Sequence, residues 1–304
     1  MLVILTVTLN PAWEVSYRVT AFEAGRAHRV DGTLARAGGR GVNVARVLAA
    51  LGERVFATGL AGGGTGASIV DELPVPHEFA QIAGESRRTI AIWSATDSSI
   101  TQLAEPGPVI QAAEWAAFIG RFDRLASIAE VVVLAGSLPP GLPPSCYAEL
   151  IDRSPARVLL DAAAEPLRMG LAAHPAMVTP SVDEVAAAIG ANGPGTTDIT
   201  ELAAACQRFA VPVAVTLGAA GAVLSTPEGS WSARPPTTIR GNPAGAADAF
   251  TAALARGLAR RVAPPDLLAD AVALSAAAVA AQQAGEFDPA TYRRLLPVVA
   301  VRRL

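Results

Sequence analysis

The spacing of hydrophobic residues differs between the N-terminal part of the chain and the rest. From residue 111 onward, stretches with helical spacing alternate with short apolar runs. The predicted helices are 111–130, 144–153, 182–190, 197–210, 246–261 and 265–284, and the predicted strands are Val131–Leu134, Val158–Leu160, Met177–Val178, Val213–Leu217 and Ala222–Ser225. Such alternation predicts an α/β fold, with a mainly parallel sheet covered by helices on both faces.

The N-terminal part has a different pattern. Residues 1–9 form an apolar run that predicts a buried strand, a helix is expected from the Gly-rich turn at residues 37–41 to Leu51, and Arg54–Leu60 reads as another strand. Segments that alternate polar and apolar residues predict half-exposed strands: Glu14–Val19, His28–Leu34, Arg88–Ser94 and Ile100–Ala104. Because these segments do not alternate with helices, they predict a small second sheet.

Composition narrows the class of protein. The chain has 304 residues, 51% of them hydrophobic, and no long linker, so a single globular unit over residues 1–304 is expected. A net charge of −3 without a basic block argues against nucleic acid as a partner. Cys146 and Cys206 lie far apart and only three histidines occur, so we expect reduced thiols and no zinc site.

The most apolar segments do not predict a membrane span. Residues 1–9 are too few to cross a bilayer and lack a basic leader. The run from Leu267 to Ala281 is dominated by alanine, and Asp266 and Asp270 interrupt its start. We therefore expect a packed helix there, no contact with a membrane, and a cytoplasmic protein.

Residues 241–250 carry the first candidate chemistry. Gly245, Ala246 and Ala247 have small side chains at a predicted helix start, where unpaired backbone N–H groups bind anions. Asp248 follows in the first turn, where a carboxylate either stabilises the helix start or accepts a proton beside a bound anion. This stretch alone leaves the two interpretations open.

One glycine cluster resembles a dinucleotide fingerprint. Gly62, Gly64 and Ala67 match a loose G-x-G-x-x-A pattern, but Pro74 and Pro76 shorten the helix that follows and no suitably placed acidic residue closes the unit. A connecting loop is the favoured interpretation. The chain also lacks the G-x-x-x-x-G-K-[ST] pattern of a P-loop.

In parallel sheets, ligands bind beyond the carboxyl ends of the strands. Six loops fall there: residues 10–13, 38–43, 135–141, 180–184, 218–221 and 241–248. The loop at 135–141 contains Gly136-Ser-Leu-Pro-Pro-Gly141, a rigid turn in which Ser137 offers a hydroxyl.

Seven motifs in order resemble the ribokinase-like (PfkB-type) carbohydrate kinases, in the branch of 1-phosphofructokinase and tagatose-6-phosphate kinase. They are Thr8-Leu-Asn-Pro-Ala12, Gly38-Gly-Arg-Gly-Val-Asn-Val-Ala-Arg46, Glu85-Ser-Arg87, Glu105-Pro-Gly-Pro108, Gly136-Ser-Leu-Pro-Pro-Gly141, Thr216-Leu-Gly-Ala-Ala-Gly221 and Gly245-Ala-Ala-Asp248. The resemblance implies a three-layer α/β/α core with a small β-sheet lid, whose strands would lie within about residues 13–36 and 87–105.

The resemblance also implies roles for individual residues. Asp248 would be the general base, and the backbone N–H groups of Gly245, Ala246 and Ala247 would hold the transferred phosphoryl group. The groups expected to bind the sugar and its phosphate are Glu14, Gly38, Gly39, Asn43, Arg29, Arg87 and Ser137. Those expected on the side of ATP and magnesium are Ser181, Glu184, Thr216, Gly218, Gly221 and Asn242, with Glu184 as the metal-binding carboxylate and residues 267–282 beside the adenine.

Several positions depart from the family pattern. Glu14 replaces an aspartate, Arg40 a lysine and Ala247 a glycine, while Thr179 and Ser181 replace the lysine and asparagine of K-P-N-x-x-E. The base and the anion-binding turn persist while sugar-facing positions differ. This combination favours a changed substrate over lost chemistry.

The leading hypothesis is an ATP- and Mg²⁺-dependent kinase of fructose 1-phosphate, fructose 6-phosphate or tagatose 6-phosphate, active as a homodimer joined through the lid. The alternatives are a kinase of another sugar and a non-catalytic protein that binds sugar phosphates or nucleotides. An oxidoreductase built on Gly62–Ala67 is a remote third.

Overall fold

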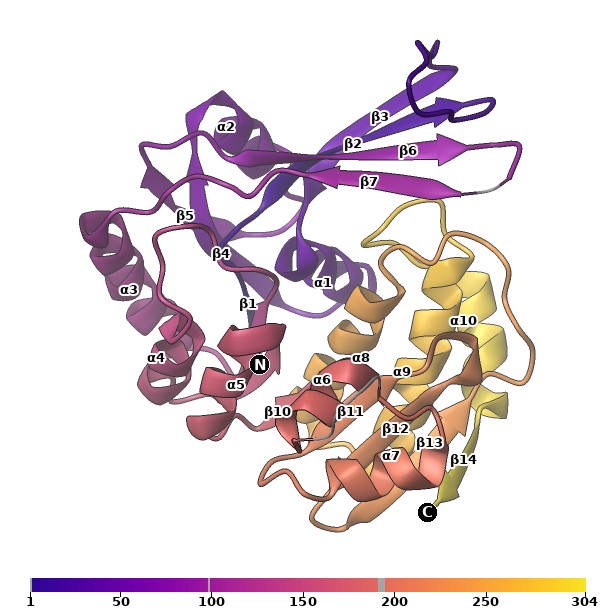
Figure 1. Ribbon diagram of the computed structural model, residues 1–304. Helices are drawn as coiled ribbons and strands as arrows, with labels where there is room; N and C mark the ends of the chain where they lie inside the picture. Colours follow the sequence, from indigo (N-terminus) through magenta and orange to yellow (C-terminus); the bar gives the residue numbers. More distant parts are fainter. Residues whose placement is uncertain (1, 98, 191–194) are drawn as a thin grey trace.

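The larger of two sheets forms the body of the molecule (Figure 1). The computed structural model describes residues 2–97, 99–190 and 195–304. Within them, ten strands pair in the order β14-β13-β12-β11-β10-β9-β8-β1-β4-β5. The strands from β11 to β5 are parallel: β1 (Ile4–Thr8), β4 (Val55–Gly62), β5 (His77–Ile82), β8 (Val131–Ala135), β9 (Arg157–Asp161), β10 (Met177–Val178) and β11 (Val213–Thr216). The antiparallel edge consists of β12 (Ala222–Thr226), β13 (Gly229–Arg234) and β14 (Ala300–Arg303).

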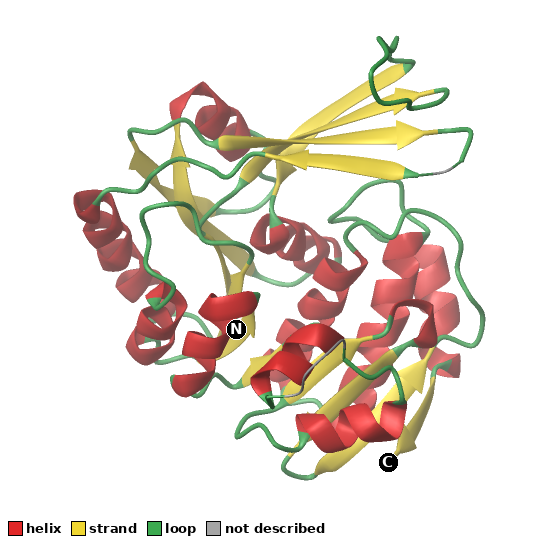
Figure 2. Ribbon diagram, viewed as in Figure 1, coloured by secondary structure: helices red, strands yellow, loops and turns green. Residues whose placement is uncertain are grey.

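Helices cover both faces of this sheet because its central strands alternate their apolar side chains between two cores. Ile4 of β1 faces the core formed with α1 (Arg40–Ala50), α8 (Ala246–Arg260) and α9 (Pro264–Val279). Leu5 faces the opposite core, which contains α3 (Ala112–Ala126), α4 (Cys146–Arg153), α5 (Ala164–Ala172), α6 (Val182–Ala188) and α7 (Ile199–Cys206). The predicted three-layer α/β/α core is confirmed, and Figure 2 shows the helices on either side of the strands.

The second sheet, here called the lid, lies apart from the first (Figures 1 and 2). Its strands pair in the order β3-β2-β6-β7, with β2 at Ala12–Val19, β3 at Gly32–Gly38, β6 at Arg87–Ser94 and β7 at Ile100–Ala104. One helix, α2 (Gly63–Asp71), packs against it through Ile69, which shares a small buried cluster with Ala37. The predicted lid strands are confirmed, with one correction at their distal end.

That correction concerns residues 28–31. The alternating pattern predicts a strand from His28, but β3 begins at Gly32, which pairs with Arg18 of β2. Residues 28–31 continue beyond the last paired position and belong to the connection from β2, which is largely exposed. Alternation of polar and apolar residues therefore misplaced the start of the strand, because the local pattern carries no information about where pairing ends.

The sequence pattern also missed several short elements. These are β5, β13, β14, α5 and α10 (Pro289–Leu295). The predicted helices 111–130, 197–210 and 265–284 are shorter in the structure, ending at Ala126, Cys206 and Val279. Within the described part of the chain, no helix combines the length and the apolar character needed to cross a membrane.

The glycine cluster at 61–67 is not a connecting loop, which corrects the prediction. Strand β4 runs directly into α2, whose first backbone N–H groups are bound by the carboxylate of Glu85: Gly64 N at 3.2 Å and Thr65 N at 2.6 Å. A helix start that already holds one of the chain's own carboxylates leaves no room for a pyrophosphate there. This arrangement removes the remaining support for a nicotinamide site.

Candidate active site

The loops at the carboxyl ends of β1, β8 and β9 are tied to one another. Asn10, just after β1, donates from Nδ2 to Ser137 Oγ at 3.2 Å and to the Pro106 carbonyl at 3.0 Å. Gly136 N donates to the Asp161 carbonyl at 3.0 Å. The predicted loops 10–13 and 135–141 therefore meet at one edge of the sheet, as parallel strands require.

The turn at the start of α8 has the backbone form predicted for an anion site. Gly245 is the N-cap with φ 83°, and a Cβ atom there would lie 2.6 Å from Ala284 Cα, so only glycine fits. The first helical bond runs from Ala249 N to the Gly245 carbonyl. The N–H groups of residues 245–248 precede it, although that of Ala246 already donates to the Pro243 carbonyl at 3.2 Å. We call residues 245–248 the cradle.

Asp248 lies at the cradle with a partner from the opposite side of the site. Its Oδ2 accepts a hydrogen bond from Asn43 Nδ2 of α1 at 2.8 Å, and both residues are buried. Burial, aided by the negative charge of Asp161, raises the pKa of Asp248 to about 7. Such a carboxylate suits general-base work near neutral pH.

Asn43 also carries an unsatisfied group. Its Oδ1 is buried and, among the described residues, has no hydrogen-bond partner. A buried carbonyl oxygen without a donor is costly, and this one is packed beside Gly285 in the same region as Asp248.

Glu14 folds back onto the Gly-rich turn before α1. Its Oε1 accepts from Gly39 N at 3.2 Å, and a Cβ atom on Gly38 would lie 2.1 Å from Glu14 Cδ. Burial raises the pKa of Glu14, and the charges of Arg36, Arg87 and Arg46 oppose that shift. The longer side chain is thus accommodated by Gly38, which explains why the turn needs glycine there.

Arg87 begins β6 and spans the gap between the lid and the β1 loop. Its Nε donates to the Asn10 carbonyl at 3.1 Å and its Nη1 to the Glu105 carbonyl at 3.2 Å. Burial lowers the pKa of this guanidinium. The structure therefore brings Arg87, Asn10 and Ser137 together around one position, where an anion would find a positive charge and a hydroxyl.

Arg29 is not part of this group. It is exposed and lies between β2 and β3, beyond the pair Arg18 and Gly32, whereas Gly39 and Arg87 lie at the opposite end of the same strands. Within one chain, the structure does not bring Arg29 to the other residues predicted to bind the substrate phosphate.

A buried carboxylate at the end of β9, that of Asp161, was missed by the sequence analysis. Asp161 accepts from Arg40 Nη1 at 2.5 Å and from Thr251 Oγ1 at 3.2 Å. Burial raises the pKa of Asp161, and Arg40 opposes that rise. The available signal was positional, since an acidic residue directly follows a predicted strand at the ligand-binding edge.

The predicted residues on the nucleotide side lie in turns or at the ends of elements, and all except the buried Gly221 are exposed or half-exposed. Ser181 is the N-cap of α6 and forms a capping box with Glu184, whose Oε2 accepts from Ser181 N at 2.7 Å. Glu184 Oε1 accepts from Ala164 N at 3.2 Å. Glu184 therefore holds two loops together in addition to any role with a ligand.

The other nucleotide-side residues shape the backbone. Thr216 ends β11, and a turn of 3₁₀ helix (Gly218–Ala220) leads to Gly221, where a Cβ atom would lie 2.0 Å from the Ala233 carbonyl oxygen. Asn242 accepts from Ala244 N at 3.0 Å and donates to the Gln282 carbonyl at 3.0 Å. These contacts fix the loop that precedes the cradle.

A preformed metal cage is not found among the described residues, in which no three His, Cys, Asp or Glu side chains cluster suitably. Magnesium in phosphoryl transfer needs less, since it keeps several waters and binds one or two carboxylates plus the phosphates. Glu184 fits that limited role, because a carboxylate accepting two N–H bonds retains acceptor capacity.

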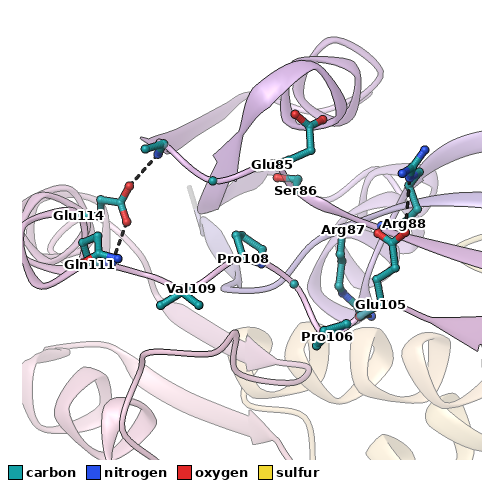
Figure 3. Close-up of a pocket in the computed structure, with 13 residues that line it drawn as sticks. Glu85, Ser86, Arg87, Arg88, Glu105, Pro106, Pro108, Val109, Gln111 and Glu114 are labelled. Atoms are coloured by element: carbon teal, nitrogen blue, oxygen red, sulfur yellow. Dashed lines mark hydrogen bonds and ion pairs between the residues drawn. The ribbon is translucent and has the colours of Figure 1, made fainter.

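An open cavity of about 760 Å³ borders the site at Arg87 (Figure 3). Its walls are residues 83–88, 105–109, Gln111 and Glu114, and they do not include Asp248 or Asn43. Glu114 spans one wall, accepting bonds from Ala83 N and Gln111 N. The cavity is therefore a neighbour of the reactive centre and not the centre itself.

The site contains a buried carboxylate, Asp248, at a helix start near the carboxyl edge of a mainly parallel sheet. The family model described as "pfkB family carbohydrate kinase" matches residues 7–291, so the chain belongs to the PfkB family of carbohydrate kinases.

Solved structures of similar fold cover almost the whole chain. A mutant form of phosphofructokinase-2 from Escherichia coli superposes with a TM-score of 0.89 at 24% identity, covering 98% of this chain and 99% of that one. A protein described as a possible 1-phosphofructokinase from Thermotoga maritima also has a TM-score of 0.89, at 25% identity, covering 99% of both chains.

Proposed function

We propose that this carbohydrate kinase transfers the γ-phosphoryl group of ATP, with Mg²⁺, to a hydroxyl of a phosphorylated ketohexose. The observation that carries the proposal is the pair formed by Asp248 and Asn43. The carboxylate can accept a proton, and the hydrogen bond from Asn43 Nδ2 fixes its orientation. A sugar hydroxyl next to this pair would be both oriented and deprotonated.

The reaction follows from these positions. Asp248 takes the proton of the acceptor hydroxyl as its oxygen bonds to the γ-phosphorus, and the bond from that phosphorus to the β–γ bridging oxygen breaks, leaving ADP. N–H groups of the cradle hold the charge on the moving phosphoryl group. Arg40, held by Asp161, adds a fixed positive charge near Asp248. Magnesium, bound with help from Glu184, would neutralise phosphate charge.

Arg87 and Ser137 support a phosphate on the acceptor. The planar guanidinium of Arg87 is held by the Asn10 carbonyl, and Asn10 also fixes Ser137. Arginine held in this way recognises phosphate oxygens bidentately. One structure of E. coli phosphofructokinase-2 is described as a complex with fructose-6-phosphate, and its fold matches this chain with a TM-score of 0.87.

The proposal also includes a homodimer joined through the lid. Large apolar side chains are exposed on one face of the lid strands, namely Leu34, Trp93 and Ile100, and their burial against a second lid would form a homodimer. A related phosphofructokinase-2 has a structure described as a tetrameric inhibited form.

Cys146 and Cys206 are buried free thiols, and burial raises the pKa of each to about 12, which suits an enzyme of the reducing cytoplasm.

An ADP-release assay tests the proposal directly. The acceptors are fructose 1-phosphate, fructose 6-phosphate, tagatose 6-phosphate, free fructose and free tagatose, each tested with ATP and Mg²⁺. We expect turnover with at least one sugar phosphate and a kcat/KM far below it for the free sugars. Faster turnover of a free sugar would overturn the assignment of the acceptor. ATP binding without turnover on any acceptor would favour the non-catalytic alternative suggested by Thr179 and Ser181.

A further inference from the structure

Arg36 is a buried arginine on lid strand β3 that is not among the groups assigned to the sugar or to phosphate. Its side chain is 11% exposed, and its register places it opposite Glu14 of β2. A guanidinium is costly to bury unless charged or polar partners meet it. The partners of Arg36 therefore indicate what it does.

Those partners lie near the other end of the chain. Arg36 Nη1 donates to Gln283 Oε1 at 2.6 Å and to Glu286 Oε1 at 3.0 Å, whereas its buried Nε finds no partner among the described residues. Both acceptors belong to residues 282–286, here called the strap, which follow α9 and precede α10. In Figure 1 the strap is part of the yellow loop below the lid strands. Arg36 thus ties the lid to the strap.

The middle of the strap fills the space between the two reactive elements. A Cβ atom on Gly245 of the cradle would lie 2.6 Å from Ala284 Cα and 3.0 Å from Gly285 N. A Cβ atom on Gly285 would lie 3.0 Å from Asn43 Oδ1. The strap backbone is therefore in close contact with the cradle on one side and with Asn43 on the other.

The beginning of the strap is joined to the loop before the cradle as well. Asn242 Nδ2 donates to the Gln282 carbonyl at 3.0 Å, and Asn242 Oδ1 accepts from Ala244 N at 3.0 Å. Asn242 therefore bonds the strap through one atom and the residue before Gly245 through the other. A displaced strap would disturb both Gly245, which it contacts, and the loop that leads into the cradle.

Charge reinforces the link between lid and strap. The positive charge of Arg36 opposes the rise that burial causes in the pKa of Glu14. Arg46 of α1 lies close enough that burial, together with the charge of Arg36, lowers the pKa of Arg46, which is paired with Glu72. Arg36 therefore stands between the carboxylate predicted to bind the sugar and the loop that borders the cradle.

We propose that Arg36 is a positioning residue that couples the lid to the cradle by pinning the strap against Gly245 and Asn43. The inference rests on the proposed kinase function and deepens it. Arg36 acts through the strap and does not touch the reacting atoms. When the lid strands hold the sugar, the same guanidinium holds the Gln283 and Glu286 side chains of the strap, whose backbone lies beside the phosphoryl site, so the two halves of the reaction are ordered together.

Kinetics and hydrogen exchange of Arg36→Ala test the coupling. We expect kcat to fall about 10- to 100-fold, because misplacement of reacting groups lowers the rate of the chemical step. The KM for ATP and the KM for the sugar phosphate should change less. Backbone amides of the strap should exchange faster than in the wild type. Arg36→Lys keeps the charge and should recover part of kcat.

The strap side supplies a test that does not alter the lid. The pair of changes Gln283→Ala and Glu286→Ala should lower kcat as Arg36→Ala does, and combining all three should cost little more, since each removes the same contacts. Arg157→Ala is the control, because Arg157 is a partly buried arginine that is paired with Glu130 at the start of β9, at the opposite end of the sheet from the site. It should leave the exchange of the strap amides unchanged.

Two results would overturn the coupling. One is wild-type kcat and wild-type exchange of the strap in Arg36→Ala. The other is a loss in the triple variant equal to the product of the separate losses. Failure of the kinase assignment is a different result, because it would appear as an inactive wild-type protein, in which the exchange measurement still reports on the strap.

Discussion

The sugar side and the nucleotide side of this site are built in different ways. On the sugar side, polar groups pair across elements that are distant in sequence: Asn43 and Asp248 are both buried, and buried Asn10 pairs with the exposed Ser137. On the nucleotide side, Glu184 pairs with Ser181 and Asn242 with Ala244, partners only a few residues away along the chain. Each of these side chains also bonds the backbone of a second loop, Glu184 at Ala164 and Asn242 at Gln282.

This difference indicates which half is preorganised. Buried long-range pairs hold their geometry because breaking them would leave polar groups unsatisfied. The turns on the nucleotide side present backbone to a ligand and are joined to other loops mainly through side chains that are exposed or half-exposed. We therefore expect substitutions on the sugar side to change the rate of the chemical step, and those on the nucleotide side to change ligand affinity or local stability.

Asp248→Asn should have the largest effect. It removes the proton acceptor while keeping the shape, so kcat should fall about 100- to 10,000-fold while ATP binding, measured by calorimetry, persists. A variant that keeps more than about a tenth of the wild-type kcat would show that Asp248 is not the base.

The same substitution should stabilise the fold at high pH. The pKa of Asp248 is raised to about 7 from an ordinary value of 3.8, so the native state holds this proton more tightly than the unfolded chain. Stability is therefore lost as pH rises between those two values. Asp248→Asn cannot ionise, so its Tm at about pH 8 should exceed that of the wild type, a gain in stability accompanying lost activity. Equal Tm values at that pH would show that ionised Asp248 costs the fold nothing.

The pH dependence of the wild type should follow from the same group. Only the ionised carboxylate accepts a proton, so kcat/KM should fall about tenfold per pH unit below a pH of about 7. Initial rates measured from about pH 5.5 to about pH 8.5 give this profile. A profile that is flat across this range would separate catalysis from the titration of Asp248.

The fold was predictable where its signals are strong and local. The central strands are continuous apolar runs and the long helices have regular spacing, so both were found. The edge strand β14 is only four residues long and mostly exposed, and α5 begins with Ala164 at φ 52°, a conformation that sequence pattern does not indicate. The missed elements are therefore those whose formation depends on tertiary pairing.

The site was predictable only as far as motifs reach. Asp248, Asn43 and Arg87 stand in recognisable motifs, and the structure brings them to one edge of the sheet. The contacts of Asp161 with Thr251 and of Arg36 with Gln283 join positions that are 90 or more residues apart and belong to no short motif. Short motifs therefore identify the residues predicted to contact a ligand, and they do not identify the residues that hold those residues in place.

Arg87→Ala tests whether the sugar side of the site recognises a phosphate on the acceptor. Hydrogen bonds to a charged group contribute about 1.5–3 kcal/mol, so kcat/KM for the sugar phosphate should fall about 10- to 100-fold. Arg88→Ala is the control: its side chain is 59% exposed and pairs with Glu105 at 3.6 Å, so kcat/KM should stay within about threefold. Equal losses in both variants, or an equal loss on a free sugar, would show that Arg87 does not recognise the phosphate.

Glu184→Gln and Ser181→Ala give the smallest expected effects and separate two roles on the nucleotide side. Glutamine still completes a capping box, so Glu184→Gln should change stability little while raising the magnesium concentration needed for half-maximal rate. Ser181→Ala removes the cap and keeps the carboxylate, so it should cost about 1 kcal/mol of stability without that shift. Magnesium titrations and thermal unfolding measure both. If neither variant changes the magnesium requirement, Glu184 is a structural cap alone, and the nucleotide side offers the metal only its phosphates and water.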